Sequence, residues 1–520
     1  MTILGSNDSM LRGKRHSDFG MSFHFVKKQS KLSFGPLINN SDRLRKEDKT
    51  FMFEKIKKLF GATDMTTGTP WKRIVVFTIP MLIGNIAQQL YSTVDSIVVG
   101  EYVGDNALAA VGSAGPIVNL LMVLFIGISM GVSIMVAQHF GAKQREELSH
   151  TIGNCISITA IAVVIIMIVS ALAARPLLEL LNTPESIIDW CTSYLLILFV
   201  GCVGSAYYNI LSGVLRGLGD AFSALIYLLV ATVINIVLDI YFVAKLDMGV
   251  AGVAWATIIA QAVSALLCYL RLKQLSEVFD LSPRYFKIKG NYAGRIIKLG
   301  LPSGLTQAIF STAMIIVQSL TNSFGEAFIA ASVIIMRVDG FAMLPNFSFG
   351  TAMTTYTGQN VGARRMDRVT KGAKQGVILA VLTSAVLTSL ILIFGRTLMG
   401  LFTETTEIID LSRKLMSIIA VGYIAVAVTQ SLSGVMRGAG DTMTPMWISL
   451  VTTVFVRVPI AYGISYLTRT AELPMGRQEC IHISLLCSWL VGAIITTLFY
   501  LAGSWKKKAA RTIEKNNQNS

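Results

Sequence analysis

Three polar residues, Asp95, Asn235 and Asp239, lie inside apolar segments that are long enough to cross a lipid bilayer. A charged side chain at the bilayer centre costs at least ~2.5–3.5 kcal/mol, so a chain that keeps one there indicates a task for the charge. Asn235 and Asp239 are four residues apart and therefore share one face of a helix. Residues of this kind in a largely apolar chain indicate ion-coupled transport.

Together with Thr257, these residues are expected to meet near one depth of the membrane. At a helical rise of ~1.5 Å per residue, Asp95, Asp239 and Thr257 each lie roughly 8–10 Å below the outer surface, with Asn235 one turn deeper. Their oxygens suit a hard monovalent cation such as Na⁺. They equally suit H⁺, because two close carboxylates cannot both ionise cheaply at low dielectric. For any single residue of the set, the alternative role is a hydrogen bond between helices.

The composition places the chain among membrane proteins. Of its 520 residues, 53% are hydrophobic and 14% are charged, whereas a soluble domain carries about 25% charged residues. The apolar residues form about twelve runs that can each cross ~30 Å of hydrocarbon as a helix, so we expect an all-α integral membrane fold with twelve transmembrane helices. The expected spans are 74–99, 108–137, 152–174, 190–213, 222–243, 250–271, 299–321, 327–356, 374–394, 410–433, 443–466 and 481–502.

The positive charges predict the orientation of these spans. If the N-terminus is cytoplasmic, clusters such as the basic run from Arg364 to Lys374 lie in inside loops. This distribution obeys the positive-inside rule and predicts a cell-membrane protein with both termini in the cytoplasm. The net charge of +15 is thus a topology signal, and no nucleic-acid partner is expected. The six cysteines lack metal-ligand spacing, so we expect packing roles for them, no transition metal, and no cofactor besides the coupling ion.

The sequence repeats itself at an offset of 221 residues, from Asn209 to Gln430. The box NILSGVLRGLGD at 209–220 matches QSLSGVMRGAGD at 430–441, and QHFG at 138–141 matches QNVG at 359–362. Each half holds six spans, an even number, so two six-helix lobes are predicted, related by a pseudo-two-fold axis along the membrane normal. Transporters of this build bind small-molecule substrates between their halves and alternate access by rocking them.

The repeat divides the chain into five expected regions. A disordered basic cytoplasmic tail at 1–70 precedes an N-lobe at 71–271, a basic cytoplasmic linker at 272–298, a C-lobe at 299–503 and a basic tail at 504–520. We expect the protein to be a monomer in the lipid bilayer.

The repeated box is expected to end a span at the cytoplasmic face. Asp220 and Asp441 are predicted to cap the helices that follow. Arg216 and Arg437 are predicted to meet the C-terminal carbonyls of their own helices or lipid phosphates.

Further polar residues are candidates for a substrate cavity, namely Gln88, Tyr91, Asn209, Arg337, Asp339 and Arg457. Intramembrane charges usually pair or face a cavity. We therefore predict that Arg457 interacts with Asp339, and Arg337 is the alternative partner of that acid. Pro80, early in the first span, removes a backbone hydrogen bond and provides a bending point, which is either a passive kink or a moving hinge.

Over about residues 65–505 the chain resembles the multidrug and toxic compound extrusion (MATE) family of the MOP superfamily. The resemblance rests on the paired SGVLRGLGD and SGVMRGAGD boxes, YSTVDSIVVG at 91–100, NIVLD at 235–239, and GVAGVAWAT at 249–257. It implies an N-lobe cation site formed by Asp95, Asn235, Asp239 and Thr257, and a bending proline at Pro80. It also implies antiport of Na⁺ or H⁺ against bulky, often cationic organic compounds, which is multidrug efflux.

One departure from the family concerns the C-lobe. Some MATE branches carry a Glu in the seventh span, but residues 301–321 contain no acid, and Val456 and Ile460 replace the pair Asn235 and Asp239. The coupling site is therefore expected in the N-lobe only. An alternative function is a lipid-linked oligosaccharide flippase of the same superfamily, in which Arg337 and Arg457 would face the cavity. No enzyme is expected, because no nucleophile–base or metal constellation is visible.

Overall fold

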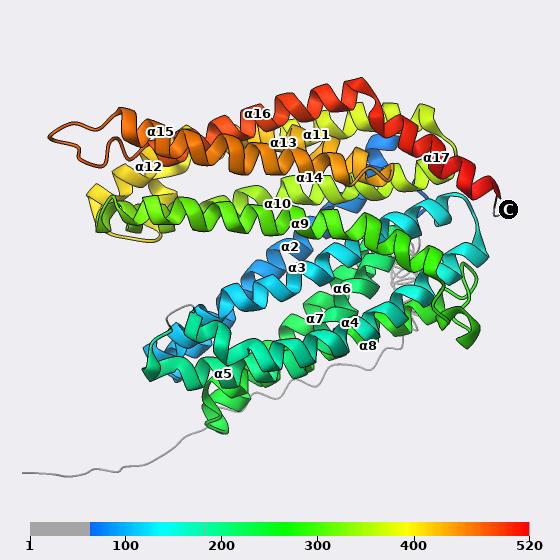
Figure 1. The fold of residues 1–520 in the computed structure, drawn as a ribbon, viewed down its shortest axis with the longest axis horizontal. Coiled ribbons are helices and arrows are strands. Elements are labelled where there is room, and N and C mark those ends of the chain that lie inside the picture. Colours follow the sequence, from blue (N-terminus) through cyan, green and yellow to red (C-terminus); the bar gives the residue numbers. More distant parts are fainter. Residues whose placement is uncertain (1–62, 181–182, 519–520) are drawn as a thin grey trace, which may run out of the picture. The chain divides into compact units, whose positions relative to one another are not determined.

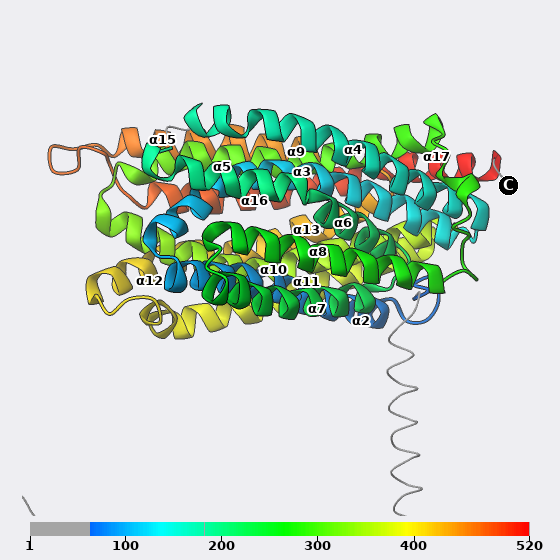
Figure 2. The same ribbon diagram turned by 90° about the horizontal axis from the view of Figure 1, so that it is seen from below.

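The computed structural model describes residues 63–180 and 183–518, in which every regular element is a helix (Figures 1 and 2). The tail predicted at 1–70 lies outside the described residues as far as residue 62. In the described part, ten helical segments are long and apolar enough to cross a membrane. Two further pairs of shorter helices, each bent at a glycine, bring the possible spans to twelve. The predicted all-α membrane fold is confirmed.

The first lobe runs from α2 to α8. Its elements are α2 (Pro70–Tyr102), α3 (Asp105–Gly141), α4 (Arg145–Leu180), α5 (Glu185–Val200), α6 (Cys202–Gly217), α7 (Ala221–Asp239), the π-helical segment η1 (Ile240–Lys245) and α8 (Gly249–Gln274). A connecting segment with the short 3-10 helix η2 (Pro283–Phe286) then leads to the second lobe.

The second lobe repeats this order. Its elements are α9 (Gly290–Asn322), α10 (Glu326–Gly362), α11 (Met366–Gly400), α12 (Thr406–Ala420), α13 (Gly422–Gly438), α14 (Met443–Leu450), the π-helical segment η3 (Val451–Val456), α15 (Arg457–Leu467) and α16 (Cys480–Ala502). A final helix, α17 (Ser504–Gln518), follows at the C-terminus.

Each lobe has its own apolar core. The first is built around buried side chains such as Leu148, Leu215 and Phe279, and the second around Phe328 and Leu415. Five of the six cysteines are buried and none forms a disulfide in the described residues, which agrees with the packing role predicted for them. The apolar residues left outside these cores suit contact with lipid rather than water.

A glycine bend interrupts the fourth span of each lobe. The helices on either side of Gly201 are bent by 49°, and those on either side of Val421 and Gly422 by 42°. At both bends a neighbouring side chain takes the space of a Cβ atom: Ile258 of α8 would lie 2.1 Å from a Cβ on Gly201, and Trp489 of α16 2.5 Å from one on Gly422. Close packing therefore requires glycine at both places.

The capping prediction for the repeated boxes is confirmed. Asp220 accepts a hydrogen bond from the backbone N–H of Ser223 at 3.0 Å, and Asp441 accepts one from Thr444 at 3.2 Å. Each carboxylate satisfies one of the N–H groups that have no partner at the start of a helix. The sharp turn between the two spans is thereby fixed in both lobes.

The C-terminal tail predicted at 504–520 contains a helix that packs on the second lobe. Trp505 of α17 is fully buried, and its indole N–H donates to the carbonyl of Tyr500 at 2.9 Å. Lys508 forms an ion pair with the capping carboxylate of Asp441 at 2.6 Å. Lys508, one of the basic residues of this tail, therefore has a defined partner in the second lobe.

The two lobes meet where the end of α3 crosses the end of α10. A Cβ atom on Gly141 would lie 1.9 Å from the carbonyl oxygen of Gln359, and one on Gly362 would lie 1.9 Å from that of Gln138. The QHFG and QNVG segments of the two halves thus pack backbone against backbone, and each supplies the glycine that the other requires. We call these two four-residue segments, 138–141 and 359–362, the crossing.

Hydrogen bonds at the crossing follow the same reciprocal pattern. Gln138 of α3 donates to the carbonyl of Gly438 at the end of α13, at 2.9 Å. Gln359 of α10 donates to the carbonyl of Gly217 at the end of α6, at 3.1 Å. Each lobe therefore satisfies a helix C-terminal carbonyl in the other lobe, and both bonds are buried.

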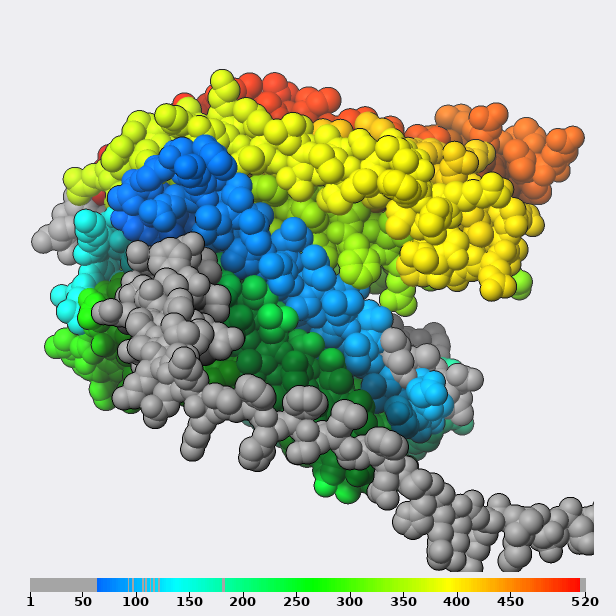
Figure 3. Space-filling model, turned by 180° about the vertical axis from the view of Figure 1, so that it is seen from behind, coloured from blue at the N-terminus to red at the C-terminus, as the bar shows by residue number. Residues whose placement is uncertain are grey.

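The first helix of each half also packs on the opposite half. Gly127 and Gly131 of α3 face Gly300 and Gly304 of α9 so closely that a Cβ on Gly131 would lie 2.5 Å from the carbonyl oxygen of Ile296. Such small-residue pairs four apart let helix backbones approach closely. On the other side, α2 contacts α7 in its own lobe and α10 and α11 in the other. Figure 3 shows α2, in blue, between helices of both lobes.

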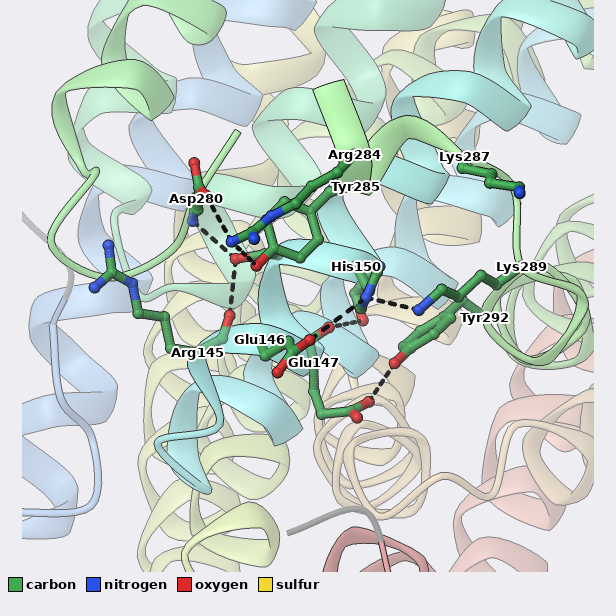
Figure 4. Close-up of polar contacts among 12 residues, drawn as sticks. Arg145, Glu146, Glu147, His150, Asp280, Arg284, Tyr285, Lys287, Lys289 and Tyr292 are labelled. Carbon is green, nitrogen blue, oxygen red and sulfur yellow. Dashed lines mark hydrogen bonds and ion pairs between the residues drawn. The ribbon is translucent and has the colours of Figure 1, made fainter. Parts of the chain in front are cut away.

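The segment predicted as the linker, 272–298, is docked on α4 and contains the start of α9 (Figure 4). The backbone N–H of Lys289 donates to Asn154 at 2.7 Å, and the hydroxyl of Tyr292 donates to Glu147 at 2.7 Å. Tyr285 packs edge-on against the ring of His150, with ring centroids 4.7 Å apart. The segment that connects the lobes is therefore fixed to α4 of the first lobe by these contacts.

The glycine contacts of α3 lead to a test of the crossing. We expect Gly141→Ala to destabilise the protein by about 1–3 kcal/mol, because the added methyl group meets backbone that cannot rotate away. The measurement is thermal unfolding of the purified protein in detergent.

The matched control is Gly115→Ala on the same helix, where a Cβ has no neighbour within 4 Å. Equal melting temperatures for the two variants would contradict the backbone contact described for the crossing.

Candidate cation and substrate sites

Helices α2, α7 and α8 bring the polar residues of the first lobe together. The hydroxyl of Tyr91 on α2 donates to the hydroxyl of Thr257 on α8 at 3.2 Å. One turn further along α2, Asp95 faces Asp239 of α7 closely enough for the two carboxyl groups to interact. Asn235 and Asp239, one turn apart on α7, are completely buried. These neighbours come from three helices that are widely separated in sequence.

Several oxygens of this cluster have no hydrogen-bond donor among the described residues. They include both carboxylate oxygens of Asp239, Oδ1 of Asp95 and the amide oxygen of Asn235. A buried polar group without a partner is costly, so a fold that keeps several of them together suits a positively charged occupant. Carboxylate, amide and hydroxyl oxygens fit Na⁺ in type, and the two acids fit H⁺.

A π-helical segment, η1, starts directly after Asp239. Such segments widen the helix by one residue per turn and are frequent at functional sites. In the second lobe, the π-helical segment η3 ends directly before Arg457. At the repeat offset η1 would correspond to residues 461–466, so the two π-helical segments occupy different positions in the fifth span of each lobe; η1 follows an acid, and η3 precedes a base.

Sequence reasoning missed two residues near this cluster. Tyr194 of α5 interacts with both Asp95 and Asp239. Gln261 lies one turn beyond Thr257 on α8, is buried, and its side-chain oxygen has no partner among the described residues. The spacing of Gln261 from Thr257 could have indicated a shared helix face, whereas nothing in the sequence places α5 against α2.

A cavity of about 400 Å³ lies in the second lobe. Its walls combine aromatic, hydroxyl and charged side chains with one residue of the first lobe, and they include Thr306, Phe310, Asp339, Phe347, Arg437, Trp489 and Gln89 of α2. Cavities of this size with a mainly apolar wall and a few polar groups are typical ligand sites.

The remaining candidate cavity residues lie in different surroundings. Tyr91 belongs to the first-lobe cluster, Gln88 is exposed on α2, and Arg337 is exposed on α10. Asn209 is half-buried in α6, where its side chain donates to the carbonyl of Ser205 at 2.9 Å. Of the six candidates, only Asp339 is among the residues that line the cavity described above.

Arg457 and Asp339 interact, but they do not form a close ion pair. Arg457 is buried, and its Nε has no hydrogen-bond partner among the described residues, nor has Oδ1 of Asp339. The two charges are nevertheless near enough to interact electrostatically. Arg457 also interacts electrostatically with His482 of α16. The alternative partner, Arg337, is exposed and forms no ion pair with Asp339.

The prediction for Arg216 is wrong. Its guanidinium meets neither helix C-terminal carbonyls nor the lipid surface; it donates to the hydroxyl of Ser212 at 3.0 Å and to that of Ser129, on α3, at 3.1 Å. Arg437, its counterpart, makes no hydrogen bond with a described residue and lines the second-lobe cavity. The glycines that follow each arginine let α6 and α13 pack so closely on α3 and α10 that both arginines are drawn inside.

Two repeated lobes of membrane-spanning helices, with a buried acidic cluster in one and a cavity in the other, define the architecture of a secondary transporter. The family model MatE matches residues 80–241 and 302–463, one match in each lobe. The chain therefore belongs to the MATE family of the MOP superfamily, whose members are transporters.

Individual relatives agree with this assignment. The probable multidrug resistance protein YoeA of Bacillus subtilis is 29% identical, over 84% of this chain and 95% of that protein. The structure of this chain is also similar to two solved crystal structures of MATE, one in the straight conformation (TM-score 0.79, 25% identity) and one in the bent conformation (TM-score 0.80, 26% identity). Both similarities cover 86% of this chain, and they cover 99% and 98% of the respective solved chains.

The interaction between Arg457 and Asp339 can be tested by a double-mutant cycle. We expect the loss of stability in the double variant Arg457→Leu/Asp339→Leu to be smaller than the sum of the single losses by about 0.5–3 kcal/mol, because each single variant leaves one buried charge uncompensated. Melting temperatures in detergent provide the readout.

Arg337→Leu combined with Asp339→Leu is the control, and there the losses should simply add, because Arg337 is exposed. Additive losses in the Arg457 cycle as well would exclude the interaction.

Proposed function

We propose that the protein is a cation-coupled antiporter that exports bulky, often cationic organic compounds. The observation that carries the proposal is the first-lobe cluster, in which Asp95, Asn235 and Asp239 present buried oxygens without donors among the described residues, beside the hydroxyl of Thr257. Relatives named as multidrug resistance proteins support the substrate class. The coupling ion is Na⁺ or H⁺, bound at these four residues, and it is the co-transported cargo rather than a fixed cofactor.

The proposed transport cycle uses the crossing as the inner closure. The crossing is at the end of α3 and α10 that precedes the basic loops, the end that the positive charges assign to the cytoplasm. With the lobes joined there by buried backbone contacts, substrate leaves towards the outside. Return to the inward state requires both reciprocal glutamine bonds to break. The protein would act in this way in the cell membrane, with both termini in the cytoplasm.

The coupling ion would drive this cycle through α2. A ligand shifts a conformational equilibrium only by its different affinity for the two states. Asp95, at the ion site, and Pro80, fifteen positions earlier where the helix lacks one hydrogen bond, lie on the same helix. Since α2 also contacts α10 and α11, a change in its bend at Pro80 would move surfaces of both lobes. Similar MATE structures have been solved in a straight and in a bent conformation, which supports a conformational change in a protein of this fold.

The first test concerns the two acids. We expect Asp95→Asn and Asp239→Asn each to abolish uphill efflux of a fluorescent cation from cells, with near-normal amounts of protein in the membrane, because the amide cannot carry the coupling charge. Efflux is measured with an imposed Na⁺ gradient and, separately, with an imposed pH gradient, so that the dependent gradient identifies the ion.

Asp189→Asn is the control, because Asp189 is an exposed acid of the same lobe that pairs with Arg175 at 3.4 Å. Uphill efflux at the wild-type rate in both site variants would refute the coupling assignment.

The second test concerns the lobe movement. Spin labels at Lys273 on α8 and Lys371 on α11, which are exposed and belong to different lobes, should report a distance distribution that changes with Na⁺ or pH. In Asp239→Asn the distribution should no longer respond, because the ion would lose its preference for one state. Native cysteines are replaced beforehand, and the measurement is double electron–electron resonance in lipid nanodiscs. A wild-type distribution that stays the same across Na⁺ concentrations and pH would argue against coupling through this site.

A further inference from the structure

The repeated arginine of the SGVxRG box has different neighbours in the two lobes. In the first lobe, Arg216 is held by the hydroxyls of Ser129 and Ser212. At the repeat offset, Ser212 corresponds to Ser433, but Ser129 corresponds to Gly350. The second lobe therefore lacks one of the two groups that bind the guanidinium in the first.

The positions correspond in space as well as in sequence. A Cβ atom on Gly350 would lie 3.4 Å from Nη2 of Arg437, so a side chain there would meet the guanidinium. The same Cβ would lie 3.2 Å from the carbonyl oxygen of Gln430, which is a close contact, and Gly434 crosses Gly350 as Gly213 crosses Ser129 in the first lobe. The first lobe accommodates a serine at the same kind of crossing.

Arg437 is left without a partner inside the cavity of the second lobe. Its Nε is buried without a hydrogen bond, and no described acidic side chain interacts with it. Asp339, the acid on the cavity wall, is eleven positions before Gly350 on α10, roughly 16 Å along the helix. A guanidinium in such surroundings is costly unless an anion compensates it, and its planar fork of N–H groups matches a carboxylate.

We propose that Arg437 forms an anion subsite of this cavity and binds the carboxylate of an amphipathic organic substrate. The cavity wall places Phe310, Phe347 and Trp489 where they can contact the apolar part of such a molecule. This inference rests on the proposed transport function, since it names a ligand of the transporter's own cavity.

The test uses a pair of dyes that differ only at the carboxylate. Rhodamine 110 carries a free carboxylate, and rhodamine 123 is its methyl ester. Binding to the purified protein is measured by equilibrium dialysis, with the same detergent on both sides and no ion gradient. The quantity compared between variants is the ratio of the two dissociation constants, rhodamine 123 over rhodamine 110.

We expect Arg437→Gln to lower this ratio roughly tenfold to a hundredfold, which is the usual range for the loss of a charge-assisted hydrogen bond. Gly350→Ser should lower it too, because the new hydroxyl would engage the guanidinium as Ser129 does in the first lobe. Gly350→Ala is the matched control, since it adds the methyl group without a hydroxyl, and it should keep the wild-type ratio.

A wild-type ratio in Arg437→Gln, or equal ratios in Gly350→Ser and Gly350→Ala, would overturn the proposal. Lipid phosphate shares this anion chemistry, so the dialysis is repeated with phosphatidylglycerol in the micelles. Displacement of rhodamine 110 that depends on Arg437 would assign the subsite to lipid and overturn the substrate assignment. Because no gradient is used, a failure of ion coupling would leave these ratios unaffected and would appear only in the efflux assay.

Discussion

The backbone contact between α3 and α10 is the constraint on which the two-lobe structure depends. Hydrocarbon gives no hydrophobic drive for helices to associate, so association needs close packing and satisfied polar groups. At the crossing both are present twice: Gly141 and Gly362 allow the backbones to touch, and Gln138 and Gln359 each donate to a carbonyl at the end of a helix in the other lobe. Such a contact cannot slide by small amounts, so the lobes are either joined here or apart.

The repeat shows how one scaffold was given two kinds of chemistry. Helix lengths, helix bends and aspartate caps recur in both lobes, because they shape the backbone and satisfy its polar groups. The charged side chains of the fifth span differ. Asp239 precedes the π-helical segment of the first lobe, and Arg457 follows that of the second. Among the described residues, the first lobe thus gathers two acids with oxygens that lack donors, whereas the second also keeps two arginines, Arg437 and Arg457, whose Nε groups lack acceptors.

The sequence predicted the helices and the caps well, because both depend on local patterns. Runs of apolar residues mark the spans, and an Asp after a Gly-rich turn marks a helix start wherever the neighbouring helices lie. It predicted the contact between α2 and α8 less directly, through equal depth, and Tyr91 and Thr257 are indeed hydrogen-bonded. Depth gives the level of a residue in the membrane and says nothing of the direction in which its side chain points.

That missing direction explains the errors. Arg216 was expected at the membrane surface because it ends a span, but the rotation of α6 points it at Ser129 of α3. Arg337 and Asp339 are two residues apart, so on a helix they point in different directions, and only Asp339 reaches the cavity. Tyr194 could not be placed beside the acids, since the contact between α5 and the acidic cluster depends on the packing of the whole lobe.

The division of charge between the lobes bears on how the proposed antiporter would avoid dissipating its ion gradient. If ion and substrate bound the same side chains, a cationic substrate would simply replace the ion. The oxygens of the acidic cluster, which are the proposed ion ligands, lie in the first lobe among α2, α7 and α8, and the cavity with Arg437 lies in the second. Ion and substrate would then not compete for the same side chains. Coupling would require only that the ion favours one state of the crossing, joined or apart, and that the substrate favours the other. α2 contributes Asp95 to one site and Gln89 to the other, so among the described helices it is the one that contacts both.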